Sequence, residues 1–439
     1  MANLQTTFAG IRSPNPFWLA SAPPTDKAYN VSRAFEAGWG GVVWKTLGED
    51  PPIVNVSGPR YGAFLTPDRR LLGFNNIELI TDRPLATNLA EIRQIKRDWP
   101  DRAVLVSLMV PCDEGSWKRI LPMIEDTGCD GVELNFGCPH GMSERGMGAA
   151  VGQVPEYVEM VTSWCKQASR LPVVVKLTPN ITDIRQPAMA ARRGGADAVS
   201  LINTISSIMG VDPDTLTMQP AVGRQGTHGG YCGPAVKPIA LHMVAAIAGA
   251  PQAAGMPISG IGGISTWRDA LDFIALGCTT VQVCTAAMFH GFRIVAEMID
   301  GLSNYLEERG FASLDEVRGR ALPSVVEWQH LDLNVVGKAV IDPVTCIGCG
   351  RCHVACEDTS HQAITSQRDG ARHFEVDEAH CVGCNLCVAV CPVPECITMR
   401  TLAPGEIDAR TGRAVPASAA DWTTHRNNPA RLARPARGD

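Results

Sequence analysis

The sequence lacks the features that would place the protein in a membrane, in a secretory pathway or on nucleic acid. Among its 439 residues, no apolar run approaches the ~20 residues that a membrane-spanning helix needs. The opening stretch MANLQTTFAGIRSPNPF has neither the basic start nor the apolar segment of a signal peptide. Lysine and arginine number 39 against 45 acidic residues, so no basic surface for phosphate binding is expected. We therefore expect a soluble cytoplasmic protein that binds neither nucleic acid nor a membrane.

A glycine fingerprint for dinucleotides is also missing, because G-x-G-x-x-G occurs nowhere in the chain. A Rossmann site for NAD or FAD is therefore not predicted. The hydrophobic content of 45% nevertheless indicates a globular protein. A chain of this length has room for one core of about 250 residues and at least one further module.

Cysteine, by contrast, is plentiful and unevenly placed. Eight of the sixteen cysteines fall between Cys346 and Cys391, and the others are scattered singly. Without a secretory signal, such cysteines are expected to be reduced thiols, metal ligands or catalytic groups rather than disulfides.

The dense stretch contains the spacing C-x2-C-x2-C-x3-C twice, which is typical of two [4Fe-4S] clusters. Three cysteines of each run hold one cluster, and the fourth reaches the other cluster. The alternative is zinc, which generally uses paired C-x2-C units and four ligands in all. Glu357 stands where the first run would normally have a proline. The predicted ligand sets are Cys346, Cys349, Cys352 and Cys391 for one cluster, and Cys381, Cys384, Cys387 and Cys356 for the other.

Eight short β-branched runs alternate with helix-compatible segments between residues 16 and 290. This alternation predicts an α/β fold, a (β/α)8 TIM barrel, with a doubly wound sheet as the alternative. The expected strands are PFWLAS, GVVWKT, AVLVSLM, GVELNFG, VVVKLT, AVSLINT, PISGIGG and TVQVCTA. We predict a barrel over residues 1–315, a linker over 316–335, a small two-cluster, ferredoxin-like α+β domain over 336–400, and an extended or disordered tail over 401–439.

Polar residues and glycines stand at the ends of the expected strands, where a barrel brings them together on one rim. Gly262 and Gly263 offer backbone N–H groups without a side chain in the way, as a phosphate cradle would, although a tight turn is the alternative. Because no dinucleotide fingerprint is present, a phosphate site in the barrel indicates FMN.

These residues resemble the catalytic half of the dihydropyrimidine dehydrogenases, within the dihydroorotate dehydrogenase superfamily. The motifs ELNFGCPHGMSERGMG, VKLTPN, LINTIS and NNIELI carry the resemblance, together with the two cysteine runs. The bacterial catalytic subunits are the most similar members, since the long single-chain members have additional cluster and nucleotide-binding modules. The resemblance implies an FMN enzyme that interconverts uracil or thymine with their 5,6-dihydro forms.

The resemblance also implies which residues bind each ligand. For Glu78, a solvated loop carboxylate is the alternative, and single asparagines can also be turn caps. Gly137 departs from the family, which has a serine just before the cysteine. The implied FMN contacts are Ala20, Ser21, Lys45, Thr46, Lys176, Gly230, Gly262, Gly263, Cys284 and Thr285, and the implied substrate contacts are Asn76, Glu78, Asn135, Asn203 and Thr204.

Cys138 is the predicted general acid and base. Reduction of the pyrimidine 5,6 double bond needs a hydride at C6 and a proton at C5 from the opposite face. A thiol, with an ordinary pKa near ~8.5, can exchange that proton in both directions. A nucleophile would need a depressed pKa and an adjacent base, for which His140 is the nearest residue, and a merely packed cysteine is a further alternative. Gly141, Gly146 and Gly148 suggest that a mobile lid closes over the thiol.

The two cofactor types predict a partner. A hydride carries two electrons, an iron–sulfur cluster passes one at a time, and a flavin can do both. Electrons should therefore enter through the clusters from an FAD-containing, NAD(P)H-oxidising subunit, in a hetero-oligomer. Two alternatives stay open. One is a dihydroorotate or other cyclic-amide dehydrogenase, for which orotate would require a cation, and the other is a non-catalytic electron-transfer protein.

Overall fold

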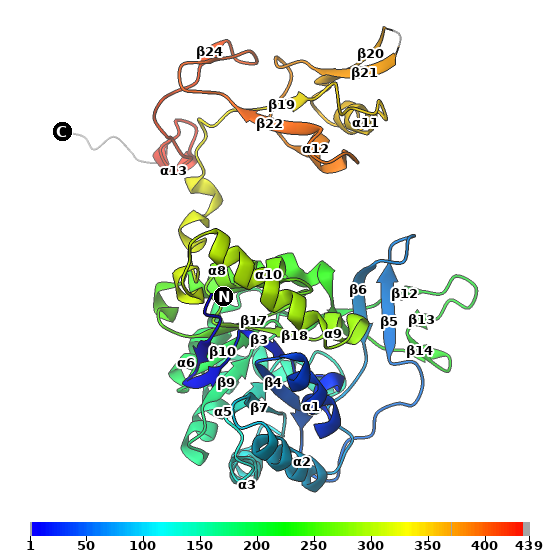
Figure 1. Ribbon diagram of the computed structural model, residues 1–439, viewed down its shortest axis with the longest axis vertical. Helices are drawn as coiled ribbons and strands as arrows, with labels where there is room; N and C mark the ends of the chain where they lie inside the picture. Colours follow the sequence, from blue (N-terminus) through cyan, green and yellow to red (C-terminus); the bar gives the residue numbers. More distant parts are fainter. Residues whose placement is uncertain (1, 370, 433–439) are drawn as a thin grey trace, which may run out of the picture. The chain divides into compact units, whose positions relative to one another are not determined.

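The computed structural model describes residues 2–369 and 371–432, and the chain divides into two compact units, Met1–Ser324 and Val325–Asp439 (Figure 1). The boundary places residues 316–324, which were expected to begin the linker, in the first unit. No helix among the described residues is long and apolar enough to cross a lipid bilayer.

The first unit is a closed barrel of eight parallel strands. All eight expected strands are present, and closure through the pairing of Val281 with Phe17 excludes the doubly wound alternative. Every residue of these strands is buried, because helices cover the outside while side chains fill the inside. In order along the chain, the strands are β3 (Phe17–Leu19), β4 (Gly41–Leu47), β7 (Ala103–Leu108), β8 (Gly131–Asn135), β9 (Val173–Lys176), β10 (Ala198–Leu201), β17 (Ile258–Ile261) and β18 (Thr280–Val283).

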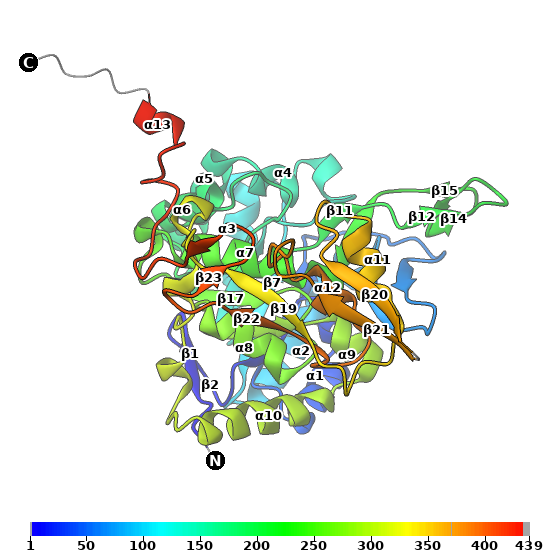
Figure 2. The same cartoon turned by 90° about the horizontal axis from the view of Figure 1, so that it is seen from above.

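Helices lie outside the strands of this unit, as both views show (Figures 1 and 2). Local signals explain where some of them begin: Asp113 accepts a hydrogen bond from the backbone of Ser116, and Thr266 with Asp269 forms a capping box. The helices are α1 (Ala28–Ala37), α2 (Leu85–Asp98), α3 (Glu114–Glu125), α4 (Ala149–Gly152), α5 (Pro155–Ala168), α6 (Arg185–Arg193), α7 (Lys237–Ala248), α8 (Trp267–Ala275), α9 (Thr285–His290) and α10 (Ile294–Glu308).

A hairpin of β1 (Thr6–Phe8) and β2 (Ile11–Ser13) closes the amino-terminal end of the barrel. Phe8 packs edge-on against Trp18 of β3, with ring centroids 5.6 Å apart, and both side chains are fully buried. The carboxyl ends of the strands are therefore the end that remains available for a site.

A four-stranded antiparallel sheet was not expected from the sequence. Its strands pair in the order β11–β16–β6–β5 and come from the two long loops that follow β4 and β10. It stands to one side of the barrel in Figure 1, next to two small hairpins. The strands of the sheet are β5 (Tyr61–Leu65), β6 (Leu71–Asn76), β11 (Ile205–Ser207) and β16 (Gly229–Cys232), and the hairpins are β12 (Gly210–Val211) with β13 (Met218–Gln219) and β14 (Ala221–Val222) with β15 (Gln225–Gly226).

The second unit holds both cysteine runs on a small α+β framework. Its core includes Ala339, Phe374 and Ile397 together with several cysteines. The antiparallel pairs are β19 (Gly337–Ile341) with β22 (Ile397–Thr401) and β20 (Ile364–Asp369) with β21 (Ala371–Val376), and the helices are α11 (Arg351–Glu357) and α12 (Leu386–Val390).

The expectation of an extended or disordered tail is corrected for residues 401–432. This segment forms the hairpin β23 (Ile407–Asp408) with β24 (Arg413–Ala414) and the short helix α13 (Pro429–Leu432). Asp408 lies 2.8 Å from the ammonium of the fully buried Lys338, which explains why the segment packs despite its weak periodicity. Residues 433–439 of the expected tail lie outside the described residues.

Candidate active site

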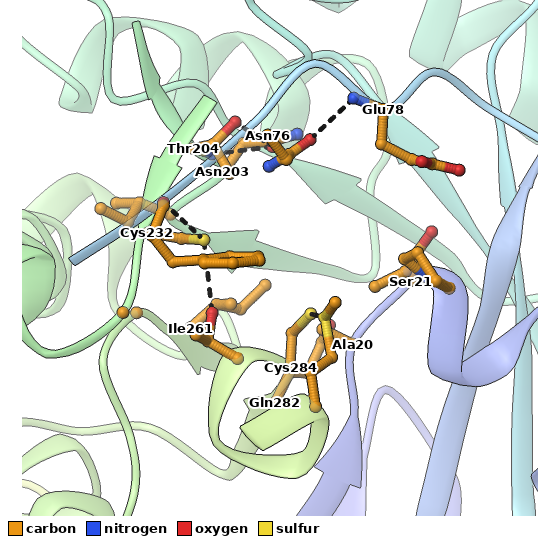
Figure 3. A pocket seen from close by; sticks show the side chains of 18 of the residues that line it. Ala20, Ser21, Asn76, Glu78, Asn203, Thr204, Cys232, Ile261, Gln282 and Cys284 are labelled. Atoms are coloured by element: carbon orange, nitrogen blue, oxygen red, sulfur yellow. Dashed lines mark hydrogen bonds between the residues drawn. The ribbon is translucent and has the colours of Figure 1, made fainter. Parts of the chain in front are cut away.

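A cavity opens at the carboxyl ends of the barrel strands. It is lined by every residue predicted to contact FMN or substrate except Gly230, which lies one layer behind on β16. In Figure 3, Asn76, Glu78, Asn203 and Thr204 stand on one side, and Ala20, Gln282 and Cys284 stand across from them. The predicted residues in the lining are Ala20, Ser21, Lys45, Thr46, Asn76, Glu78, Asn135, Cys138, Lys176, Asn203, Thr204, Gly262, Gly263, Cys284 and Thr285.

Glu78 is the centre of a buried charge network. Its carboxylate lies 2.8 Å from the Lys45 ammonium, accepts from Arg60 at 3.1 Å, and accepts from the Tyr61 hydroxyl at 3.1 Å. A second carboxylate, Asp26, lies 3.8 Å from Lys45. The solvated-loop interpretation of Glu78 is therefore wrong, because its side chain is only 8% exposed and pairs with Lys45.

The pKa values of these carboxyls follow from burial and pairing. Burial alone would raise the pKa of Glu78, but hydrogen bonds and charge attraction from Lys45 and Arg60 outweigh it, so that this pKa lies below its usual value. For Asp26, burial dominates and raises the pKa despite Lys45. Glu78 therefore stays ionised at neutral pH beside Lys45 and Arg60, and Asp26 supplies a second carboxylate near Lys45.

The other lining lysine, Lys176 at the end of β9, is also compensated. Its ammonium lies 3.6 Å from a carboxylate oxygen of Glu133, and the two side chains are 6% and 0% exposed. Both lysines in the cavity wall thus face a buried carboxylate.

Side-chain amides line the other part of the cavity and hold one another in place. Asn203 donates to the Asn135 oxygen at 2.8 Å, and Asn135 donates to the Thr46 hydroxyl at 3.0 Å. Asn76 donates to the carbonyl of Gly230 at 3.1 Å. Each amide keeps a second donor hydrogen or lone pair, so the set can meet the alternating donors and acceptors of a cyclic imide.

Gly137, the departure from the family serine, allows this arrangement. A Cβ at this position would lie 2.3 Å from the Cβ of Asn203, a distance that real structures essentially never show. Gly230 has a similar role, because a Cβ added at this position would lie 2.2 Å from the Thr204 hydroxyl oxygen. The two glycines therefore leave room for Asn203 and Thr204 beside the cavity.

Cys138 lines the cavity from the loop after β8. Its thiol donates to the carbonyl of His140 at 3.5 Å, while its own carbonyl accepts from the Ser143 hydroxyl at 2.6 Å. Burial raises the pKa of the thiol to about 11, which Lys176 offsets only in part. A raised pKa favours a neutral proton donor and is the opposite of what a nucleophilic thiolate needs.

The loop that carries Cys138 contacts the cap, our name for the two long loops after β4 and β10 that form the four-stranded antiparallel sheet. The His140 Nε2 atom lies 3.0 Å from the carbonyl of Glu78, and His228 lies 3.1 Å from the carbonyl of Pro139. The loop is therefore closed over the cavity in the structure, and its opening as a lid stays a prediction.

The barrel residues fit an FMN group. Gly262 and Gly263 have φ values of 132° and 72°, and both line the cavity, so their backbone can approach a phosphate closely. The two lysines in the cavity wall supply donors, and each lies beside a carboxylate.

The cysteines of the second unit fit two clusters. Cys356, Cys381, Cys384 and Cys387, the predicted second ligand set, line one cavity. In the first set, burial raises the pKa of the Cys352 thiol, and the nearby Cys346 and Cys349 thiols raise it further. Cys391 and Cys346 share Cys396 as a neighbour, and Cys396 itself is 2% exposed. The crossover of the fourth cysteines therefore agrees with the fold.

Several lining residues were missed by the sequence analysis. Tyr61 and Phe74 come from the unexpected sheet, and Tyr231 and Cys232 come from its strand β16. Gln282 is different, because a polar residue inside the apolar run TVQV is a signal that the sequence did contain.

A barrel with lysines, amides and glycines at its strand ends, followed by two four-cysteine runs, defines an iron–sulfur flavoprotein oxidoreductase. The chain belongs to the dihydroorotate dehydrogenase family, which it matches over residues 3–306. Residues 339–399 match a 4Fe-4S dicluster domain, which decides against zinc.

The relatives of the chain include both dihydropyrimidine and dihydroorotate enzymes. It is 41% identical to the NAD-dependent dihydropyrimidine dehydrogenase subunit PreA of Escherichia coli K12, over 93% of this chain and 97% of that one. It is 41% identical to the chloroplastic dihydropyrimidine dehydrogenase (NADP(+)) of Arabidopsis thaliana, over 73% and 77% of the two chains. It is 36% identical to the catalytic subunit of dihydroorotate dehydrogenase B (NAD(+)) of Pyrococcus abyssi, over 73% and 99%.

Gly137→Ala should raise the Michaelis constant for substrate while the flavin stays bound, because the added methyl group displaces Asn203 from Asn135. Loss of one well-placed hydrogen bond predicts a rise of roughly tenfold. Steady-state kinetics and the flavin absorbance of the purified protein measure both quantities. Gly210→Ala is the control, since nothing lies within 4 Å of its added Cβ. An unchanged Michaelis constant would show that Asn203 does not bind the substrate.

Proposed function

We propose that the chain is the catalytic subunit of a dihydropyrimidine dehydrogenase, which reversibly reduces uracil or thymine to the 5,6-dihydropyrimidine. The observation that carries the proposal is the charge balance of the cavity. Lys45 and Lys176 are the lysines in its wall, and Glu78 and Glu133 compensate them. A neutral imide suits such a site, whereas the carboxylate of orotate would need a cation without a partner.

The residues of the cavity divide the work of the reaction. When bound, FMN supplies hydride transfer and the clusters supply one-electron transfer. Asn76, Asn135 and Asn203 hold the imide edge of the pyrimidine, so that C6 faces the flavin side of the cavity. Cys138 holds a proton for C5 on the opposite face, and the closed loop that carries it excludes water.

The proposed electron source is an FAD-containing subunit that oxidises NADH or NADPH. The absence of a dinucleotide fingerprint in the sequence supports a separate electron source, as does the similarity to an Escherichia coli protein that is one subunit of its enzyme. None of the sixteen cysteines forms a disulfide in the structure, and this supports a reducing compartment such as the cytoplasm.

Two other functions are less well supported. A dihydroorotate dehydrogenase shares the barrel, but the balanced charges of this cavity do not suit its acidic substrate. A protein that only carries electrons would not need Cys138, three amides and paired lysines around one cavity.

Dihydrouracil should be oxidised, and dihydroorotate should not, when the purified chain is assayed anaerobically with an artificial one-electron acceptor. Glu78→Gln should make orotate an inhibitor that binds about tenfold more tightly, because Lys45 and Arg60 lose their shared carboxylate. Glu49→Gln is the control, since that carboxylate pairs with Arg119 outside the cavity. Equal turnover of both substrates by the unmodified chain would refute the proposed substrate class.

Cys138→Ala should lower turnover by roughly 10²- to 10⁴-fold while flavin and iron remain bound, because only the proton donor is lost. In the unmodified chain, oxidation of dihydrouracil needs the thiolate at the outset, so its rate should rise with pH toward the raised pKa of about 11. Uracil reduction needs the neutral thiol and should be flat through neutral pH. Cys112→Ala, in a half-buried thiol outside the cavity, is the control. Near-normal turnover of Cys138→Ala would mean that another residue is the acid.

The isolated chain should not oxidise NADH or NADPH, and addition of a flavoprotein diaphorase subunit should couple either nucleotide to uracil reduction. Cys349→Ala should abolish the coupled reaction but leave the oxidation of dihydrouracil by an artificial acceptor, because the thiol belongs to a predicted cluster and not to the barrel. Cys112→Ala again serves as the control. Rapid NADH oxidation by the isolated chain would overturn the two-subunit proposal.

A further inference from the structure

Six polar side chains form a connected group inside the barrel, where side chains are ordinarily apolar. All come from barrel strands, and four of them, Glu133, Ser200, Ser259 and Thr280, are fully buried. The other two, Lys176 and Gln282, are 5% and 1% exposed and line the active-site cavity. The predicted acid, Cys138, belongs to a different element and does not explain this group.

Glu133 connects the members of the group. One carboxylate oxygen accepts from the Ser200 hydroxyl at 2.7 Å and from the Gln282 amide at 3.1 Å. The other oxygen lies 3.6 Å from the Lys176 ammonium and has no hydrogen-bond partner among the described residues. One buried carboxylate thus holds both an ammonium and an amide that reach the cavity.

The contacts of Gln282 determine which end of its amide is available. The nitrogen lies 3.1 Å from Glu133 and 3.2 Å from the Ser259 hydroxyl. With the amide reversed, its oxygen would face a carboxylate that can only accept, so the reversed orientation is excluded. The amide oxygen of Gln282 has no partner in the described part of the chain, and the residue lines the cavity. Gln282 therefore presents an acceptor, and Lys176 a cationic donor.

This pair matches one edge of the isoalloxazine ring. Its pyrimidine end has adjacent N1 and C2 carbonyl acceptors, where negative charge collects on reduction, and an N3–H donor. The Lys176 ammonium can donate to N1 and to the C2 carbonyl, and the Gln282 oxygen can accept from N3–H. Figure 3 shows Gln282 beside Ala20 and Cys284, which the resemblance assigns to FMN.

We propose that Glu133 is a positioning residue for the flavin: it holds Lys176 and Gln282 against the pyrimidine end of FMN, and its negative charge keeps the flavin reduction potential low. An ammonium without this carboxylate would stabilise the reduced ring and would oppose hydride transfer to a pyrimidine double bond. The proposal rests on the FMN site of the proposed function but not on the identity of the substrate.

A purely structural role would not account for the choice of residue. Burying a carboxylate and an ammonium costs more free energy than burying apolar side chains of similar size, and the mutual attraction of the charges often fails to offset that cost. The strand neighbours of Glu133, Val132 and Leu134, are apolar and fully buried. The carboxylate at this position is therefore explained by what it does for Lys176 and Gln282.

The test is an anaerobic redox titration of the flavin in the purified holoenzyme, with a reference dye and without substrate. Glu133→Gln should keep its flavin and favour the reduced form by about tenfold or more, which corresponds to about 30 mV for a two-electron couple. Lys176→Met should shift the equilibrium in the opposite direction. The double variant should lie between the two, because it removes both charges as a pair. Thr280→Val, at the far end of the group, is the uncharged control and should leave the potential unchanged.

The outcomes separate the possibilities. An unchanged potential in Glu133→Gln with bound flavin would overturn the proposal. If Glu133→Gln loses its flavin, recovery of binding in the double variant would support charge pairing. Loss of flavin in both, with retention in Lys176→Met, would overturn the proposal by showing that Glu133 serves folding alone. Because no substrate is present, failure of the dihydropyrimidine assignment would leave these results unaffected.

Discussion

Charge compensation inside a low-dielectric cavity is the constraint on which the site depends. An ammonium at the end of a barrel strand is costly to bury unless a carboxylate lies beside it. The site contains two such pairs: Glu78 lies beside Lys45, and Glu133 lies beside Lys176. The two carboxylates come from different parts of the fold, since Glu133 belongs to barrel strand β8 whereas Glu78 belongs to the segment inserted after β4. The barrel therefore balances Lys176 by itself, whereas Lys45 has its nearest carboxylate, Glu78, on the inserted segment and a second one, Asp26, 3.8 Å away.

The cap and the catalytic loop are coupled through the same contacts. The Glu78 carboxylate forms ion pairs with Lys45 of the barrel and with Arg60 of its own segment. The Glu78 carbonyl lies beside His140, in the loop that carries Cys138. Any movement that opens this loop must break a contact to the residue that balances the cavity charge. The proposed proton transfer and water exclusion thus share one set of residues with the charge balance, which is a physical reason for the long insertion after β4.

The second unit illustrates how a short cysteine motif can specify a site while leaving the rest of its fold to longer-range contacts. The spacing within each run places three thiols on one loop and helix, and the fourth thiol of the other run completes the set. The segment beyond residue 401 is held by a different force. Its Asp408 pairs with the buried Lys338, whose ammonium also donates to the carbonyl of Cys381 at 2.8 Å. The segment after the cluster domain is therefore tied to a cluster loop.

The sequence by itself determined the barrel, and it predicted the cluster ligands and most of the residues that line the cavity, because these depend on local features: strand periodicity, cysteine spacing and polar residues at strand ends. Only the tertiary structure decided the rest. The cap sheet has short strands, three of which contain glycine, and they leave no periodic signal. The role of Gly137 depends on Asn203, 66 positions away in the chain, as the close approach of their atoms shows. The packing of residues 401–432 and the grouping of Glu133 with Lys176 and Gln282 likewise arise from contacts between distant segments, which a single sequence does not encode in any local pattern.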